Sequence, residues 1–151
     1  MIRLARDDER AQLDDICFRA KAHWGYDAAF MESVRDQIRV SSEAIALGYV
    51  WVALDEAGKP CAVMQIDRID RRAADLSLMF VAPDAMRGGH GRALFEKACE
   101  IARAMQVAEL LIDSDPQATG FYAAMGCTRI GAEPTGYQGR LLPRFAFALI
   151  R

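Results

Sequence analysis

The chain has 151 residues, of which 52% are hydrophobic and 26% charged, and its formal net charge at pH 7 is −2. This length and composition are typical of one globular domain and exclude a disordered chain. The slightly acidic balance also argues against nucleic acid as a partner, because nucleic-acid-binding proteins usually carry a strong basic excess. We therefore expect a single domain over residues 1–151.

The cysteines indicate a reducing compartment. None of the four has the spacing of a metal knuckle or a redox pair, so we expect no metal site: Cys17, Cys61, Cys99 and Cys127. Free thiols favour a cytoplasmic location. The first residues resemble no signal peptide, and no segment approaches the roughly 20 apolar residues that span a bilayer, so no membrane partner is expected.

The first half of the chain predicts two helices and a β-hairpin. After a short strand over 2–5, Asp7 and Asp8 offer N-cap oxygens for a helix. Its apolar residues recur at i, i+3, i+4 and i+7: Leu13, Ile16, Cys17 and Ala20. A second helix begins near Ala28, with one apolar face: Phe30, Val34 and Ile38. Apolar runs over 49–54 and 61–67 predict two strands joined by turn residues.

The second half alternates strands and helices. A strand over 76–81 precedes three glycines and a helix with an apolar face: Leu94, Ala98, Ile101, Ala102 and Met105. A strand over 110–112, a short helix over 118–125 closed by Gly126, and a last strand over 145–150 follow. Strands and helices are intermingled, so the fold class is α/β, or α+β with a mixed sheet.

The segment over 81–94 carries the main chemical signal, because it runs from strand through glycine-rich turn to helix. The first turn of a helix has unpaired N–H groups and partial positive charge. Glycines let a phosphate approach the backbone closely. Two arginines can add charge-assisted contacts. The residues predict a pyrophosphate site: Arg87, Gly88, Gly89, His90, Gly91 and Arg92.

The pattern of this turn favours coenzyme A. No Gly-Lys-Ser/Thr follows, which excludes a Walker loop, and the third glycine of a dinucleotide fingerprint is replaced by Leu94. Met86-Arg87-Gly88-Gly89-His90-Gly91 resembles the coenzyme A loop of the GNAT N-acetyltransferase superfamily, R/Q-x-x-G-x-G/A. It fits at Gly89 and Gly91 and departs at Met86, where Arg or Gln is usual.

A second match lies downstream of the loop. Ala118-Thr119-Gly120-Phe121-Tyr122-Ala123-Ala124-Met125-Gly126-Cys127 resembles the family's A-x-x-x-Y-x-x-x-G-F, with Cys127 in place of Phe. The resemblance implies that Tyr122 is the general acid that protonates the departing thiolate. Asp115 falls where many members carry an Asn that contacts coenzyme A.

The resemblance also implies a fold and a cofactor position. The GNAT fold is a mostly antiparallel sheet that splays at its centre and is flanked by helices. Its strand before the glycine loop carries a bulge whose main chain pairs with the pantetheine arm, which implicates Met79, Phe80 and Val81. The likeness extends to a bacterial subgroup with unknown substrate through three further segments: residues 21–26, 114–116 and 139–143.

Direct transfer to an amine needs a base that removes the ammonium proton. Asp75 begins the strand before the glycine loop, where many family members have Glu or Asp. Asp113, at the end of the next strand, is the other candidate and a possible acceptor contact. His23, Trp24 and Tyr26 are interpreted either as a helix stop with core aromatics or as a wall of the acceptor site.

We therefore expect a cytoplasmic acetyltransferase that uses acetyl-CoA and acts on a primary amine of a small molecule or peptide. Many relatives dimerise, so a homodimer is expected. The alternative is a coenzyme A-binding sensor without catalysis. A Rossmann-type nucleotide-binding domain is disfavoured by the missing third glycine and ribose-binding acid.

Overall fold

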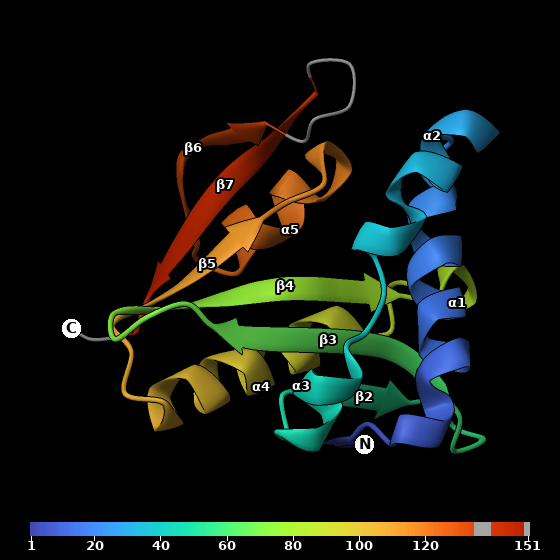
Figure 1. Cartoon of the computed structure of the whole chain (residues 1–151), viewed down its shortest axis with the longest axis horizontal. Coiled ribbons are helices and arrows are strands. Elements are labelled where there is room, and N and C mark those ends of the chain that lie inside the picture. Colours follow the sequence, from blue (N-terminus) through green and yellow to red (C-terminus); the bar gives the residue numbers. More distant parts are fainter. Residues whose placement is uncertain (135–139, 150–151) are drawn as a thin grey trace. The chain divides into compact units, whose positions relative to one another are not determined.

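Seven strands form one sheet in the order β1-β2-β3-β4-β5-β7-β6 in the computed structural model, which describes residues 1–134 and 140–149 (Figure 1). The strands are β1 (Ile2–Leu4), β2 (Val50–Leu54), β3 (Pro60–Arg68), β4 (Ala73–Val81), β5 (Glu109–Asp113), β6 (Thr128–Pro134) and β7 (Leu141–Ala148). The helices are α1 (Arg10–Ala22), α2 (Ala28–Val34), α3 (Ser42–Ala46), α4 (His90–Ala104) and α5 (Thr119–Ala124). This mixed sheet with flanking helices confirms the predicted fold class.

The strand directions separate this sheet from a Rossmann fold. β1 with β2, β2 with β3, β5 with β7 and β6 with β7 are antiparallel pairs, whereas β4 and β5 are parallel. A Rossmann sheet is mostly parallel. The chain divides into two compact units, one made of Met1–Ile66 with Leu78–Ala98 and the other of Asp67–Ser77 with Cys99–Arg151.

The first unit follows the apolar pattern of the sequence. The face predicted for α1 is buried, as is the face predicted for α2: Leu13, Ile16, Cys17, Ala20, Phe30, Val34 and Ile38. Asp27 caps α2, because its carboxylate accepts the N–H of Phe30 at 2.8 Å. The break at residues 23–26 lies where the sequence predicts it.

The predicted cap of α1 is wrong. A 3₁₀ turn over Asp7–Glu9 precedes the helix, and Arg6 rather than either aspartate occupies its N-cap position. The Asp7 carboxylate instead accepts the hydroxyl of Ser42 at 2.7 Å. Glu9 supplies the acceptor at this turn, since its Oε1 accepts the N–H of Arg6 at 2.9 Å.

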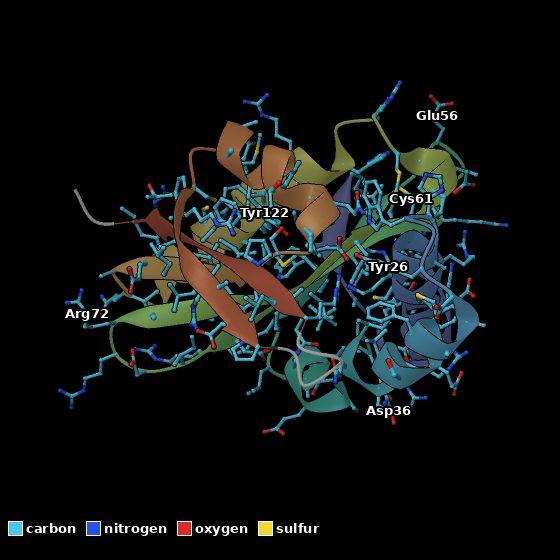
Figure 2. All side chains as sticks on the ribbon, turned by 90° about the horizontal axis from the view of Figure 1, so that it is seen from above. Tyr26, Asp36, Glu56, Cys61, Arg72 and Tyr122 are labelled. Carbon is cyan, nitrogen blue, oxygen red and sulfur yellow. The ribbon has the colours of Figure 1, made fainter. Side chains whose placement is uncertain are left out.

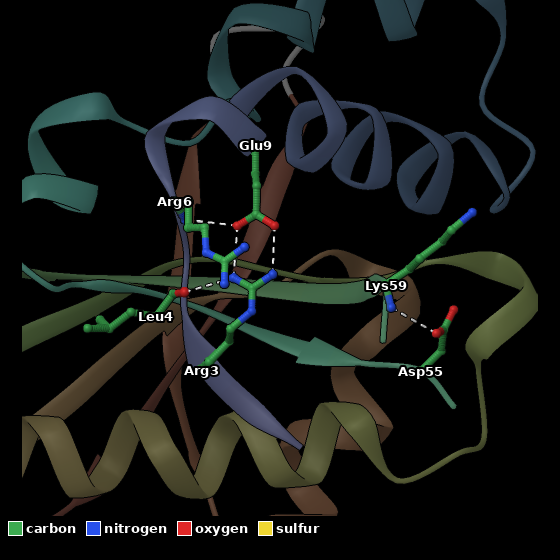
Figure 3. Close-up of polar contacts among 6 residues, drawn as sticks. All are labelled: Arg3, Leu4, Arg6, Glu9, Asp55 and Lys59. Carbon is green, nitrogen blue, oxygen red and sulfur yellow. Dashed lines mark hydrogen bonds and ion pairs between the residues drawn. The ribbon is translucent and has the colours of Figure 1, made fainter. Parts of the chain in front are cut away.

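A paired arginine holds Glu9 in this position (Figure 3). The Nη1 and Nη2 atoms of Arg3 donate to the two Glu9 carboxylate oxygens at 2.9 and 2.7 Å. This two-pronged contact ties β1 to the turn before α1, and the side chains are only 23% and 12% exposed. Bidentate, half-buried pairs of this kind are stronger than surface ion pairs.

The second unit contains the C-terminal strands and α5, coloured orange to red in Figure 1. β4 begins at Ala73, three residues earlier than expected, with Ala73 and Ala74 both buried. β7 begins at Leu141, four residues earlier than expected, while the predicted end at Ile150 and the family-like Gly139 lie outside the described residues. The β6–β7 register shifts between Arg129 and Gly131.

Two elements were not predicted. α3 is only five residues long and begins after Ser41, whose hydroxyl accepts the Ala44 N–H at 3.2 Å. β6 is exposed along its length except at half-buried Glu133, so its sequence lacks the alternation that predicts a strand. No described helix is both long and apolar enough to cross a bilayer.

The Arg3–Glu9 contact gives a stability prediction. Glu9→Gln should lower the free energy of unfolding at pH 7 by about 1–2 kcal/mol, the usual loss for a charge-assisted pair. The hydrogen bonds from Arg3 lower the pKa of Glu9, so this stability is present above glutamate's ordinary pKa and is lost as pH falls through the lowered one. Urea unfolding at pH 7 and pH 3 measures both effects.

A matched control is Asp15→Asn, which breaks an exposed i,i+4 pair with Arg19. That loss should stay below about 0.5 kcal/mol. Equal losses for the two variants would show that the Arg3–Glu9 contact adds nothing beyond a surface pair.

Candidate active site

The strand register of the second unit places four charged side chains on one face of the sheet. Asp75 on β4 is opposite Leu111 on β5, and Leu111 shares its face with Asp113. Asp113 is opposite Arg144 on β7, which shares its face with Leu142, the partner of Glu133 on β6. The resulting set is Asp75, Asp113, Arg144 and Glu133.

The pairing of β4 with β5 stops at Asp75. Only the first three residues of β4 pair with β5, over Ala73 to Asp75 and Glu109 to Leu111. β5 continues instead with β7, through Ile112 opposite Phe145 and Asp113 opposite Arg144. The β4–β5 ladder is therefore short, as expected for a sheet that splays at its centre.

Asp75 is the most perturbed acid on this face. Burial, followed by the negative charges of Asp113 and Asp67, raises its pKa to about 6, against the opposing charge of Arg144. No ion pair joins Asp75 to Arg71 or Arg72, the exposed arginines just before β4 (Arg72 is labelled in Figure 2). A carboxyl that titrates near neutral pH is suited to accept protons.

Arg144 joins two of the other acids. Its Nη1 donates to Glu133 Oε1 at 2.6 Å, and its Nε lies 3.8 Å from Asp113 Oδ1. Burial also raises the pKa of Asp113, although Arg144 opposes this effect. Asp67 lies nearby on β3 and accepts the hydroxyl of Ser77 at 2.5 Å.

Tyr122 points inward from α5 in the second unit (Figure 2) and is only 6% exposed. Its ring packs against Phe121, edge to face at 5.1 Å, and against Phe145 at 5.9 Å between centroids. Phe145 alternates with Arg144 along β7, so Tyr122 packs on the opposite face from the acids. The charge of Asp75 still helps to raise the pKa of Tyr122, after burial and Cys127, so the two groups interact electrostatically.

The glycine loop of the first unit has an unusual backbone. Arg87 adopts φ 69°, a left-handed conformation that few non-glycine residues take, and Gly89 adopts φ 80°. α4 begins at His90, and the Ala93 N–H donates to the Gly89 carbonyl at 3.1 Å. The N–H groups of the first turn therefore lack partners inside the helix.

The space beside Gly89 is open. A Cβ atom added at Gly89 would meet nothing within 4 Å, whereas one at Gly88 would lie 3.0 Å from the His90 ring. Arg87 and Arg92 are exposed, and Arg92 pairs loosely with Glu96 at 3.4 Å. Gly91 follows His90 in the same turn. The loop can therefore present main-chain donors and two cations to an anion.

The remaining predicted cofactor residues have mixed surroundings. Met79, Phe80 and Val81 are the last three residues of β4 and are half-buried. The Asp115 carboxylate accepts the Gln117 N–H at 2.8 Å and lies 3.4 Å from Arg140 Nη2, so it caps the turn over Pro116–Ala118.

The predicted acceptor residues of the first unit form two aromatic contacts. His23 and Trp24 are exposed and pack edge to face at 6.0 Å. Tyr26 stacks on Phe30 at 4.5 Å, and the Lys21 ammonium lies 5.4 Å from the Tyr26 ring (Tyr26 is labelled in Figure 2). Tyr26 thus takes part in the packing of α2, while the other two remain open to solvent.

Sequence reasoning missed Arg144, Glu133 and Asp67 as parts of the site. Arg144 was not assigned to a strand because β7 was expected to begin at Phe145. Glu133 was not assigned to a strand because β6 was not predicted. A residue-by-residue strand pairing would have revealed them, but pairing partners are not visible in a single sequence. Among the described residues, no group of three or more His, Cys, Asp or Glu side chains is placed to hold a metal ion.

Comparison with known families identifies the chain. Residues 12–139 match the acetyltransferase (GNAT) domain family. The chain belongs to the GNAT acetyltransferase family. This membership supports acyl transfer from coenzyme A in general. No curated protein sequence matches the chain.

Solved structures share the GNAT fold over nearly the whole chain. A GCN5-related N-acetyltransferase from Rhodopseudomonas palustris matches with a TM-score of 0.76 at 16% identity, covering 98% of this chain and 94% of that one. The ribosomal-protein-S18-alanine N-acetyltransferase from Escherichia coli matches with a TM-score of 0.72 at 21% identity, covering 100% and 94%. An aminoglycoside 6′-N-acetyltransferase complexed with coenzyme A matches with a TM-score of 0.71 at 12% identity, covering 100% and 98%.

The buried position of Asp75 predicts a cost in stability. Its raised pKa means that the folded GNAT domain keeps a proton that the unfolded chain releases between about pH 4 and 6. The contribution of Asp75 to the free energy of unfolding is fully present at low pH, where Asp75 is protonated, and is lost as the pH rises through about 6. Asp75→Asn should therefore raise the free energy of unfolding at pH 7.5 by about 1–2 kcal/mol.

Urea unfolding at pH 7.5 and pH 4 measures this difference, which should nearly vanish at pH 4. Glu56→Gln, in the exposed turn before β3, reports the effect of removing one surface carboxylate (Glu56 is labelled in Figure 2). A loss of stability in Asp75→Asn at pH 7.5 would contradict a destabilising charge at this position.

Proposed function

We propose that this GNAT protein transfers the acetyl group of acetyl-CoA to a primary amine of a small molecule or peptide by direct attack. The observation that carries the proposal is that Asp75, at the end of the β4–β5 ladder, and Tyr122 on α5 are close enough to interact electrostatically. Asp75, the proposed base, lies on the face that carries Asp113, Arg144 and Glu133, called the acid-rich face below. Tyr122, the proposed general acid, packs on the opposite face. An amine arriving on the acid-rich face and a thiolate leaving on the other would suit this arrangement.

The glycine loop supports the choice of donor. The main-chain N–H groups after Gly89, together with Arg87 and Arg92, would hold the pyrophosphate of acetyl-CoA. The main chain at Met79, Phe80 and Val81 would pair with the pantetheine arm, as the family resemblance implies. Asp115 would contribute less to coenzyme A binding, because its carboxylate already caps a turn. When bound, acetyl-CoA supplies the thioester carbonyl and a thiolate leaving group.

Proton transfers accompany the bond changes of the proposed reaction. Asp75 accepts one proton from the ammonium group, directly or through water, and leaves a neutral amine. The nitrogen–carbon bond forms and the carbon–sulfur bond breaks, while the Tyr122 hydroxyl protonates the sulfur. The second nitrogen proton restores Tyr122, and Asp75 releases its proton to solvent. Asp113 would serve as an acceptor contact, with His23, Trp24 and Tyr26 as further acceptor residues.

The same proposal covers the organisation of the protein. We propose that the chain works as a single domain in the cytoplasm and assembles as a homodimer. The match over residues 12–139 supports the single domain. The four buried free thiols, Cys17, Cys61, Cys99 and Cys127, support a reducing compartment. The dimer rests on the resemblance to dimeric relatives.

The cofactor prediction is tested by thermal unfolding. Acetyl-CoA at about 100 times its dissociation constant should stabilise the protein by about 2.7 kcal/mol, because it binds the native state alone. NADH and ATP should neither stabilise the protein nor compete. Release of coenzyme A with a panel of amines then tests transfer. Binding without transfer to any amine would favour the sensor, and stabilisation by NADH alone would exclude the assignment.

Gly89→Val tests the position of the phosphate. Valine should strain the left-handed backbone and project into the open space at the loop, weakening acetyl-CoA binding tenfold or more. Gly58→Val is the matched control, because Gly58 has φ 81° and equally open surroundings in the β2–β3 turn. Its strain should be similar and its acetyl-CoA affinity unchanged. Equal affinity in both folded variants would contradict a main-chain cradle at Gly89.

Tyr122→Phe tests the proposed general acid. The substitution keeps the packing against Phe121 and Phe145 but removes the hydroxyl, so the variant should fold and its acetyl-CoA affinity should change little. The chemical step should slow by roughly 10²–10³, as expected for one acid–base group. Single-turnover measurements isolate that step, with Tyr49→Phe, half-buried before β2, as the control. A wild-type chemical rate would make Tyr122 a packing residue only.

A further inference from the structure

Arg144 lies at the centre of the acid-rich face. It belongs to β7, which pairs with β5 on one side and β6 on the other, so it is opposite both Asp113 and Gly131. It donates to Glu133 at 2.6 Å, lies 3.8 Å from Asp113 and is 28% exposed. One cation thus links acids from the two strands that border its own.

Asp75 is surrounded by titratable groups from several elements. Asp67 faces it from β3 and Asp113 from β5, and both charges disfavour its ionised form. Tyr122 interacts with it from α5, and Glu133 on β6 belongs to the same face. The charge of Arg144 acts on Asp75 in the opposite direction, although no described residue forms an ion pair with Asp75 itself.

We propose that Arg144 is a positioning residue that neutralises Asp113 and Glu133 and so keeps Asp75 able to accept the acceptor's proton. The proposal rests on the role proposed for Asp75 as base. Without this cation, the charges of Asp113 and Asp67 would act on Asp75 unopposed. Asp75 would then hold its own proton to a higher pH, and a smaller fraction of the protein could deprotonate the amine at neutral pH.

The alternative role for Arg144 is to brace the β5–β7–β6 strands. A bracing role depends on the cross-strand hydrogen bond to Glu133, and its loss would lower stability without a directed change in the titration of Asp75. An electrostatic role predicts shifts of opposite sign when a cation or an anion is removed. The two roles are therefore separable by titration.

The test is a carboxyl ¹³C NMR titration of Asp75 in the ligand-free protein, with urea unfolding to confirm that each variant folds. In Arg144→Gln the midpoint should rise, by less than the roughly one pH unit that is the low end for a directly contacting opposite charge, because Arg144 acts on Asp75 without an ion pair. Arg144→Lys should restore most of the wild-type midpoint. Asp113→Asn should lower the midpoint, because it removes the largest neighbouring negative charge.

The pH dependence of kcat/KM adds a second readout. If Asp75 is the base, the acid limb in Arg144→Gln should move up by the same amount as the NMR midpoint, with a plateau at high pH near wild type. A shift of the NMR midpoint without movement of the acid limb would show that Asp75 is not the base. The effect of Arg144 on the titration of Asp75 would still stand. An unchanged midpoint in folded Arg144→Gln, or equal shifts in Arg144→Gln and Asp113→Asn, would overturn the proposal.

Discussion

The structure of the candidate site depends on where the β4–β5 ladder ends. Pairing of β4 with β5 stops at Asp75 and Leu111, and from there β5 continues with β7. Side chains alternate across a strand, so the last pair fixes the face on which every later residue lies. A slip of one residue would move Asp75 to the other face and separate it from Asp113 and Arg144.

The acid-rich face shows a balance between chemistry and stability. Burial of carboxylates beside one another disfavours their ionised forms. It raises the pKa of Asp75 toward neutral pH and therefore destabilises the folded chain at neutral pH. Arg144 limits this cost through its contacts with Asp113 and Glu133. A face whose carboxylates were all neutralised by cations would be more stable. The pKa of Asp75 would then be too low for it to remove a proton from an ammonium group efficiently.

Local patterns in the sequence predicted most of the elements and the β2–β3 hairpin, but not the pairing of strands distant in sequence. The apolar spacing of α1 and α4 and the turn at Gly89 follow from side chains near in sequence, so a single sequence reveals them. The starts of β4 and β7 were missed because Ala73, Ala74 and Pro143 are poor strand formers whose place depends on burial and partners. Asp75 and Tyr122 came from family resemblance, whereas Arg144 and Glu133 became visible only through the register of distant strands.

The irregularity in β6 has a consequence for how this site can change in evolution. Arg129 is opposite Phe145 and Gly131 is opposite Arg144, so Ile130 is one residue more than regular pairing needs. If Ile130 were instead paired regularly opposite Arg144, Glu133 would be opposite Leu141 instead of Leu142 and would project from the other face, away from Arg144. The charge balance of this site therefore depends on the bulge: a substitution that lets Ile130 pair regularly would reverse the face of Glu133 without changing the length of the chain, and relatives that align well by residue type can differ in this way.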